Sequence, residues 1–191
     1  MARPHVAVLA AGRGERFGGG KLEALCAGKP LGRWALDAVA EAGLEPGTIV
    51  SGPEGLSFAE DWQALVNPEP ETGLGSSLAL AARAALDLGA DALLVLLADM
   101  PLVAPAYLRQ LAEAPAPAAT RHPDGRPGVP ALLDRALMEW AASLTGDRGA
   151  GPLLVRATLL DPPAGTLRDV DRRGDLASIE RVLRQAQDEL S

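Results

Sequence analysis

A glycine-rich segment near the start of the chain carries three basic side chains. Its nine residues 12–20 include five glycines, and Arg13, Arg16 and Lys21 lie within this segment or directly after it. Glycines let backbone N–H groups approach an anion, and basic side chains at the same place neutralise its charge. The segment therefore predicts a phosphate-binding loop made of Gly12, Arg13, Gly14, Arg16 and Lys21.

Two common phosphate-binding patterns do not match this segment. Lys21 is followed by Leu22 rather than Ser or Thr, so the Walker pattern fails. The dinucleotide pattern GxGxxG also fails: Gly12 and Gly14 match its first two glycines, but the third would have to be at position 17, and the next glycine is Gly18. The near-match leaves an NAD(P)-binding oxidoreductase open as an alternative function, and an ordinary flexible loop remains the plain structural interpretation.

Carboxylates in two places could hold a metal ion. Asp99 directly follows the apolar run 91–98, and the carboxyl end of a buried strand is where open α/β sheets bind ligands. Asp169 and Asp171 flank Val170, so both side chains point the same way if the backbone is extended. Oxygen ligands suit Mg²⁺ bound together with substrate phosphates. The alternative interpretation of these residues is a turn or a helix cap.

Hydrophobic periodicity and glycine or proline breaks predict the elements that position these residues. Strands are expected at 5–11, 48–50, 65–66, 91–98, 116–120 and 167–170. Helices are expected at 31–41, 76–88, 105–113, 132–144 and 174–189, with loops at 67–75, 121–128 and 146–151. Ser76 or Ser77 is expected to cap the second helix. Alternating strands and helices predict an α/β fold with a mostly parallel sheet, formed by residues 1–191 as a single domain.

Composition excludes several classes of partner. The 191 residues carry a net charge of −7, with 3% aromatic and 48% hydrophobic residues, so a basic nucleic-acid surface or a membrane surface is not expected. No apolar run approaches the length of a membrane span, and the predicted location is the cytoplasm. The single cysteine, Cys26, excludes an internal disulfide. Only Lys21 and Lys29 among the 18 basic residues are lysines.

Six motifs, in this order along the chain, resemble the MobA-like nucleotidyltransferases, and most closely their molybdenum cofactor cytidylyltransferase branch. Residues 9–21, LAAGRGERFGGGK, resemble the signature LAAGxSxRMGxxK. The other matching segments are 28–31 (GKPL), Asn67 with 73–78 (GLGSSL), 97–101 (LADMP), 146–150 (GDRGA), and 169–171 (DVD) with 174–176 (GDL).

The resemblance implies a Rossmann-like three-layer α/β/α fold and the transfer of a nucleoside monophosphate from a nucleoside triphosphate to a phosphorylated acceptor, with release of pyrophosphate. Carried over by position, the nucleotide-binding residues are Leu9, Ala10, Ala11, Gly12, Arg13, Gly14, Lys21, Asn67, Gly73, Ser76 and Ser77. The implied catalytic residues are Arg16, Lys21 and Asp99, the implied Mg²⁺ ligands are Asp99 with Asp171 or Asp169, and the implied acceptor-binding residues are Gly146, Asp147 and Gly149.

The resemblance also implies a particular donor and acceptor. Ala11-Gly12 is typical of family members that use CTP, where users of GTP have Gly-Gly. A pterin phosphate, the molybdopterin cofactor, is the expected acceptor, and a molybdoenzyme or its chaperone would then receive the product. A nucleotide-binding accessory protein without catalysis remains a further alternative.

The chain departs from the family pattern at several positions. These are Gly14 in place of Ser or Thr, Phe17 in place of Met, Val129 in place of His, and Arg172-Arg173 in place of Thr-Pro. The phosphate loop and Asp99 keep the family pattern, whereas the acceptor side differs more from it.

Overall fold

A seven-stranded sheet forms the centre of the computed structural model, which describes residues 3–12, 14–144 and 151–189. The strand order is β5-β4-β1-β6-β8-β7-β9. Neighbouring strands pair in parallel except on the two sides of β8, which is antiparallel to both β6 and β7. The expected α/β fold with a mostly parallel sheet is confirmed.

The strands and helices have these bounds. The strands of the sheet are β1 (His5–Ala10), β4 (Thr48–Ser51), β5 (Gln63–Val66), β6 (Ala92–Leu97), β7 (Ala118–Arg121), β8 (Pro127–Asp134) and β9 (Thr158–Leu160). The strands β2 (Leu25–Cys26) and β3 (Lys29–Pro30) form a separate short hairpin. The helices are α1 (Arg33–Glu41), α2 (Leu74–Asp87), α3 (Pro105–Glu113), α4 (Arg135–Ala141) and α5 (Arg173–Glu189), with short 3₁₀ turns at Glu15–Phe17, Pro70–Thr72 and Gly151–Arg156.

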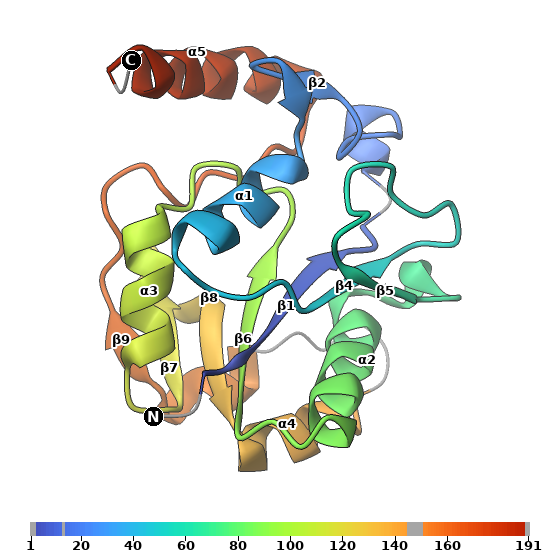
Figure 1. Cartoon of the computed structure of the whole chain (residues 1–191), viewed down its shortest axis with the longest axis vertical. Coiled ribbons are helices and arrows are strands. Elements are labelled where there is room, and N and C mark those ends of the chain that lie inside the picture. Colours follow the sequence, from blue (N-terminus) through green and yellow to red (C-terminus); the bar gives the residue numbers. More distant parts are fainter. Residues whose placement is uncertain (1–2, 13, 145–150, 190–191) are drawn as a thin grey trace.

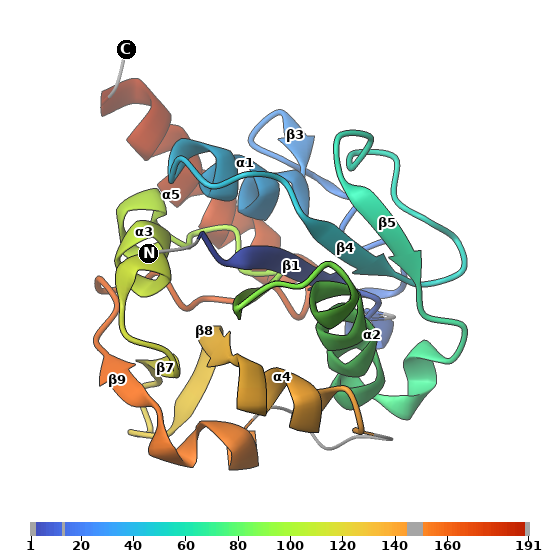
Figure 2. The same ribbon diagram turned by 60° about the horizontal axis from the view of Figure 1, so that its bottom comes forward.

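Helices cover both faces of the sheet, which gives three layers (Figures 1 and 2). Alternate residues of β1 point to opposite faces: Val6 and Val8 pack with α1 and α3, whereas Ala7 and Leu9 pack with α2 and α4. Strand β6 is buried on both sides in the same way, as a central strand of a covered sheet should be. The Rossmann-like α/β/α architecture expected from the resemblance is therefore present.

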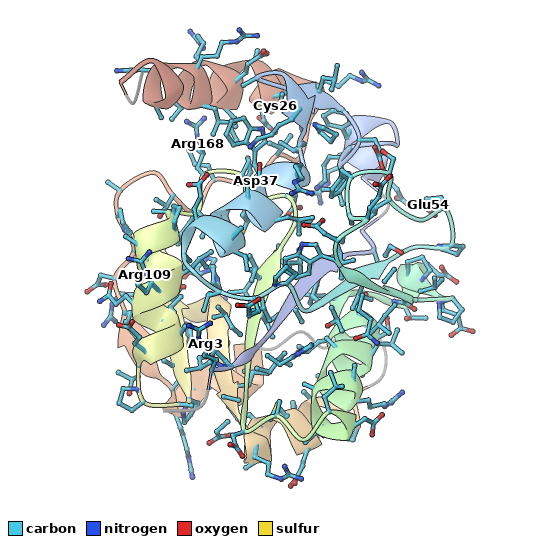
Figure 3. All side chains as sticks on the ribbon, in the orientation of Figure 1. Arg3, Cys26, Asp37, Glu54, Arg109 and Arg168 are labelled. Atoms are coloured by element: carbon cyan, nitrogen blue, oxygen red, sulfur yellow. The ribbon has the colours of Figure 1, made fainter. Side chains whose placement is uncertain are left out.

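The terminal helix α5 lies away from the central sheet, beside the β2–β3 hairpin (Figure 1). A third apolar cluster fills the space beneath it; its buried members are Phe17, Cys26, Leu31, Val170, Ile179 and Leu183. Figure 3 shows Cys26 between α5 and α1. Burial raises the pKa of the Cys26 thiol, with the charge of Glu180 adding to the effect. Cys26 is thus a packing residue of this cluster.

The sequence-based element predictions fail at the C-terminal half of the sheet. The sequence predicts one helix over residues 132–144, but Leu132 and Leu133 belong to β8 and the helix begins at Arg135. The Asp134 carboxylate caps this helix by accepting the Leu137 N–H at 2.8 Å. An apolar run of this length fits either a buried strand or a helix. The loop expected at 121–128 accordingly ends earlier, where β8 begins.

Two further expectations are corrected. Residues 167–170 form no strand; the last strand is β9, and only Val170 of the expected segment is buried. Helix α2 begins at Leu74, and neither Ser76 nor Ser77 caps it, because its N-cap position is Gly73.

Within the part of the chain that the structure describes, no helix combines the length and the apolar character that a membrane crossing requires.

Candidate active site

The phosphate loop and Asp99 lie together because β1 and β6 are neighbouring parallel strands. Leu9 pairs with Leu97 at the carboxyl ends of these strands, and the Ala98 N–H donates to the Leu9 carbonyl at 3.0 Å. The chain leaves both strands at the same edge of the sheet. Residues far apart in the sequence therefore meet at the position where parallel α/β sheets bind ligands.

The loop after β1 folds back through a tight turn at Gly14. The N–H groups of Phe17, Gly18 and Gly19 donate to the Gly14 carbonyl at 2.9, 3.1 and 3.2 Å. Gly14 has a φ of 59°, and a Cβ at this position would lie 3.0 Å from the Lys21 Cβ. The left-handed backbone and this close approach both favour glycine. The turn returns the chain so that Lys21 reaches Asp99.

Lys21 and Asp99 form a largely buried ion pair. Lys21 Nζ lies 2.7 Å from Asp99 Oδ2, and the side chains are 9% and 20% exposed. The other oxygen, Asp99 Oδ1, is buried and has no hydrogen-bond partner among the described residues. A buried carboxylate oxygen without a donor is costly unless a ligand completes its environment.

The segment from Asp169 to Asp171 lies beside Asp99. The Val170 N–H donates to the Asp99 carbonyl at 3.1 Å, which joins the two predicted metal-binding segments. Asp171 faces the phosphate loop, with its Oδ2 3.2 Å from Arg16 Nη1, whereas Asp169 is exposed. The three carboxylate positions suggested by the sequence are thus on neighbouring stretches of backbone.

The residues present fit a divalent cation only in part. Asp99 Oδ1 is a free hard ligand, and Asp171 is held near the loop by an exposed ion pair. No group of three or more His, Cys, Asp or Glu side chains in the described ranges is arranged to bind a metal. A bound Mg²⁺ would therefore take the remaining oxygens from substrate phosphates and water, as Mg²⁺ commonly does.

A cavity of about 190 Å³ opens at this edge of the sheet. It is lined by residues expected to bind nucleotide, namely Leu9, Ala10, Ala11, Gly12, Lys21, Gly73 and Ser77, and by Asp99. The N-terminus of α2 lies in its wall, and such helix ends favour negative charge. Ligand pockets for larger molecules enclose about 300–1,000 Å³, so only part of a nucleotide would be enclosed here.

Asn67 supports the wall of this cavity from behind. Its side chain is 2% exposed and donates to Ser76 Oγ at 2.9 Å and to Ser77 Oγ at 3.0 Å. Its Oδ1 accepts the Glu69 N–H at 3.0 Å, and Ser76 Oγ donates to the Gly73 carbonyl at 2.9 Å. Asn67 and Ser76 therefore shape the loop before α2, while Ser77 reaches the cavity.

A second cavity, of about 540 Å³, lies beside the first and shares Leu74 with it. The turn between β7 and β8 lines it with His122, Asp124 and Arg126. His122 Nε2 lies 3.0 Å from the Val129 carbonyl oxygen. The imidazole also packs closely against Gly128: a side chain at position 128 would place its Cβ 2.5 Å from His122 Nε2.

One of the two lysines lies away from the site, and some expected site residues lie outside the part of the chain that the structure describes. Lys29 pairs with Asp37 and stacks 3.6 Å from the Trp34 ring centroid, outside the cavity that contains Lys21. Arg13 and the expected acceptor residues Gly146, Asp147 and Gly149 lie outside the described residues.

Sequence reasoning missed several cavity-lining residues and one contact of the loop. Leu22, Pro70, Leu74 and Leu97 line the first cavity. Phe17 is in contact with Arg173 of α5, across more than 150 residues of sequence. These four residues lie next to or within the motifs named in the sequence analysis, so their positions beside those motifs could have indicated that they line the cavity. The Phe17–Arg173 contact depends on where α5 lies, which no local pattern reports.

Comparison with known proteins identifies a family. The model of the MobA-like NTP transferase domain matches residues 6–162. The purine catabolism protein PucB of Bacillus subtilis (strain 168) is 28% identical over 194 residues, covering 92% of this chain and 95% of that protein.

Solved structures share the same fold. A nucleotidyl transferase from Methanothermobacter thermautotrophicus superposes with a TM-score of 0.81 at 24% identity, covering 97% of this chain and 100% of the other. Rv0371c from Mycobacterium tuberculosis superposes with a TM-score of 0.75 at 25% identity, covering 94% and 99%. Together with the match over residues 6–162, the ordered motifs and the shared edge of the sheet, these similarities show that the chain belongs to the MobA-like NTP transferase family and is a nucleotidyltransferase.

Proposed function

We propose that this nucleotidyltransferase moves CMP from CTP to a phosphorylated acceptor, the molybdopterin cofactor, and releases pyrophosphate. The observation that carries the proposal is the Lys21–Asp99 pair at the base of the cavity, with Asp99 Oδ1 lacking a partner among the described residues. The pair holds a cation for phosphate and a free carboxylate oxygen for a metal in adjacent positions.

The chemistry requires charge neutralisation more than proton transfer. An oxygen of the acceptor phosphate forms a bond to the α-phosphorus of CTP, and the bond from that phosphorus to pyrophosphate breaks. The attacking phosphate is already ionised, so no general base is required. Lys21 neutralises the α-phosphate, Arg16 and the loop N–H groups bind the triphosphate, and the cavity around Ala11 receives the base.

Mg²⁺ is proposed as the cofactor, held by Asp99 and Asp171. Bound there, it would neutralise charge on the phosphate oxygens as the reaction proceeds. Asp171 is preferred to Asp169 because its side chain faces the loop and its partner Arg16 is exposed and exchangeable. A structure of the related Rv0371c, similar to this chain with a TM-score of 0.73, is described as a complex with manganese, which supports a divalent cation.

The choice of CTP depends on Ala11, and the choice of acceptor on the second cavity. Ala11 is 6% exposed and lines the first cavity, where its methyl group occupies space that a glycine would leave for a larger base.

The cavity beside the β7–β8 turn adjoins the nucleotide cavity at Leu74, so an acceptor lying there could present its phosphate to the α-phosphorus. A flat polar ring such as a pterin suits the mixed polar lining of His122, Asp124 and Arg126.

A ligand panel tests the donor and the reaction class. Melting temperature is measured with each of the four ribonucleoside triphosphates, with and without Mg²⁺, and with NADPH. CTP with Mg²⁺ should raise it most, because a ligand stabilises the state that binds it. Pyrophosphate release with molybdopterin as acceptor should follow. Stabilisation by NADPH with no response to CTP would instead support the oxidoreductase alternative.

The variant Asp99→Asn separates catalysis from binding. We expect pyrophosphate release to fall by about 10²-fold or more, since a charge-stabilising group is removed, while CTP still raises the melting temperature. Asp87→Asn, an exposed residue on α2, is the matched control and should keep full activity. A wild-type protein that binds CTP but releases no pyrophosphate with any phosphorylated acceptor would fit the accessory alternative and refute the proposal.

A further inference from the structure

Arg173, the first residue of α5, contacts the phosphate loop. Arg173 Nε donates to the Phe17 carbonyl at 3.2 Å, and its guanidinium carbon lies 4.9 Å from the centroid of the Phe17 ring. The Phe17 side chain is 3% exposed, packed in the cluster beneath α5. Arg173 therefore contacts both the backbone and the ring of one loop residue.

The stretch that leads to Arg173 is tied to the active site at its other end. The Val170 N–H donates to the Asp99 carbonyl at 3.1 Å. The Asp175 carboxylate accepts the N–H groups of Asp171 and Arg172 at 3.1 and 2.7 Å, which fixes the backbone between Val170 and the start of α5. This stretch thus connects Asp99 to the loop by hydrogen bonds at both ends.

Two consecutive loop residues contact this stretch in different ways. Arg16 meets Asp171 in an exposed ion pair, with side chains 74% and 48% exposed. Such pairs contribute little stability and exchange readily with other anions. Phe17 meets Arg173 through a buried ring and a backbone hydrogen bond, neither of which a phosphate would replace. The second contact can persist while the first one opens.

We propose that Arg173 is a positioning residue of the nucleotide site. Through Phe17 it holds the turn Glu15–Phe17 in place while Arg16 leaves Asp171 and binds the triphosphate. The part of this inference that concerns nucleotide rests on the proposed function. Phe17 and Arg173 are two of the positions at which the chain departs from the family pattern, and the structure places these two departures in contact with each other.

Hydrogen exchange on the ligand-free protein tests the contact without any nucleotide. In Arg173→Ala, the amides of Phe17, Gly18 and Gly19 should exchange about tenfold faster than in the wild type, since the Gly14 turn loses its external support. Arg181→Ala, an exposed arginine on the same helix, is the matched control and should leave these amides unchanged. Unchanged exchange in Arg173→Ala, or an equal increase in Arg181→Ala, would overturn the inference.

Nucleotide kinetics test the positioning role. Arg173→Ala and Phe17→Leu, which keeps an apolar side chain in the cluster, should each raise KM for CTP about five- to tenfold with kcat changed less than twofold. The double variant should resemble Arg173→Ala, because Phe17→Leu removes only the ring contact, which is already lost when Arg173 is replaced. Arg173→Lys should recover part of the loss. Fully additive effects, or a loss of kcat alone, would contradict the role. If the wild type binds no CTP, the proposed function fails while the exchange result still decides this inference.

Discussion

Lys21 and Asp99 neutralise each other, so a ligand of one charge bound alone at this pair would leave an excess of that charge in a largely buried place. If a cation approaches Asp99 while an α-phosphate approaches Lys21, both charges stay compensated throughout the exchange. A cation bound at Asp99 Oδ1 without a phosphate would add positive charge beside the largely buried Lys21 ammonium, which is unfavourable. This pair therefore favours binding of the nucleotide and the cation together.

The variant Lys21→Arg tests the need for an ammonium at this place. A guanidinium is larger and forked, whereas the Lys21 side chain is 9% exposed with its Nζ 2.7 Å from Asp99 Oδ2. We expect an unchanged fold and a transfer rate lowered about tenfold or more, measured by pyrophosphate release. Lys29→Arg, at the only other lysine, is the control and should keep the rate. An undiminished rate in Lys21→Arg would remove Lys21 from the mechanism.

The variant Ala11→Gly tests the basis of the donor preference. Removing the methyl group from the cavity wall should admit a purine, so the ratio of kcat/KM for CTP to that for GTP should fall by about tenfold, the scale of a small steric change in a pocket. Ala7→Gly, on the strand β1 that directly precedes Ala11, is fully buried outside the cavity lining and controls for lost stability. An unchanged ratio would show that the base is selected elsewhere.

At the scale of elements, the junction between β5 and α2 depends on a single buried amide. Asn67→Ala would remove hydrogen bonds to both serines and to the Glu69 N–H. We expect the free energy of unfolding to fall by about 1–3 kcal/mol, measured by urea denaturation, together with weaker CTP binding. Ser76→Ala removes only part of this network and should cost less. Equal effects of the two variants would contradict a central role for Asn67.

Most of the fold that precedes Asp99 could be predicted from the sequence, apart from the β2–β3 hairpin and the cap of α2, and the reason is local. Strands β1 and β6 are continuous apolar runs that end at a glycine loop and at Asp99, so their position and their role both follow from pattern. Motif order then placed Lys21 and Asp99 at one site. The Lys21–Asp99 ion pair itself required the three-dimensional turn at Gly14.

The remaining half could not be predicted because its signals were ambiguous. Leu132 and Leu133 suit a strand or a helix equally, and they form a strand because β8 pairs with β6 and β7, which buries the two side chains on opposite faces of the sheet. Val170 is a single apolar residue between Asp169 and Asp171, a pattern that also fits a short strand, yet it packs beneath α5 and its N–H donates to the Asp99 carbonyl. Lys29 was close to the loop in sequence only, since the β2–β3 hairpin turns it toward Asp37.

At the scale of the whole molecule, stability should depend on pH through His5. This residue begins β1, is half-buried, and has its Nε2 3.3 Å from Thr48 Oγ1. Burial lowers the pKa of His5 from its usual value of 6.5. In the unfolded chain the imidazole takes up a proton at higher pH than in the folded protein, so stability is lost as pH falls below about 6.5.

The variant His5→Gln checks this pH dependence. Gln can still hydrogen-bond Thr48 but does not titrate, so its melting temperature should fall less than that of the wild type between pH 7.5 and pH 5.5. His122→Gln, on the exposed β7–β8 turn, is the matched control. Melting curves of wild type and His5→Gln that stay parallel across this range would show that His5 does not contribute.

Because β8 runs antiparallel to its neighbours, the ligand-binding edge of the sheet has two parts. One is formed by the ends of the parallel strands β1 and β6, the other by the turn before β8, and the turn tolerates sequence changes more readily. Because Val95 pairs with Ala131 in antiparallel register, the turn that precedes β8 emerges at the same edge as Asp99, yet it connects two adjacent strands and crosses no helix. Insertions there leave the register of β1 and β6 undisturbed. If the acceptor binds beside this turn, as we propose, a lineage built on this scaffold can acquire a new acceptor by remodelling one hairpin while the phosphate loop and Asp99 stay unchanged.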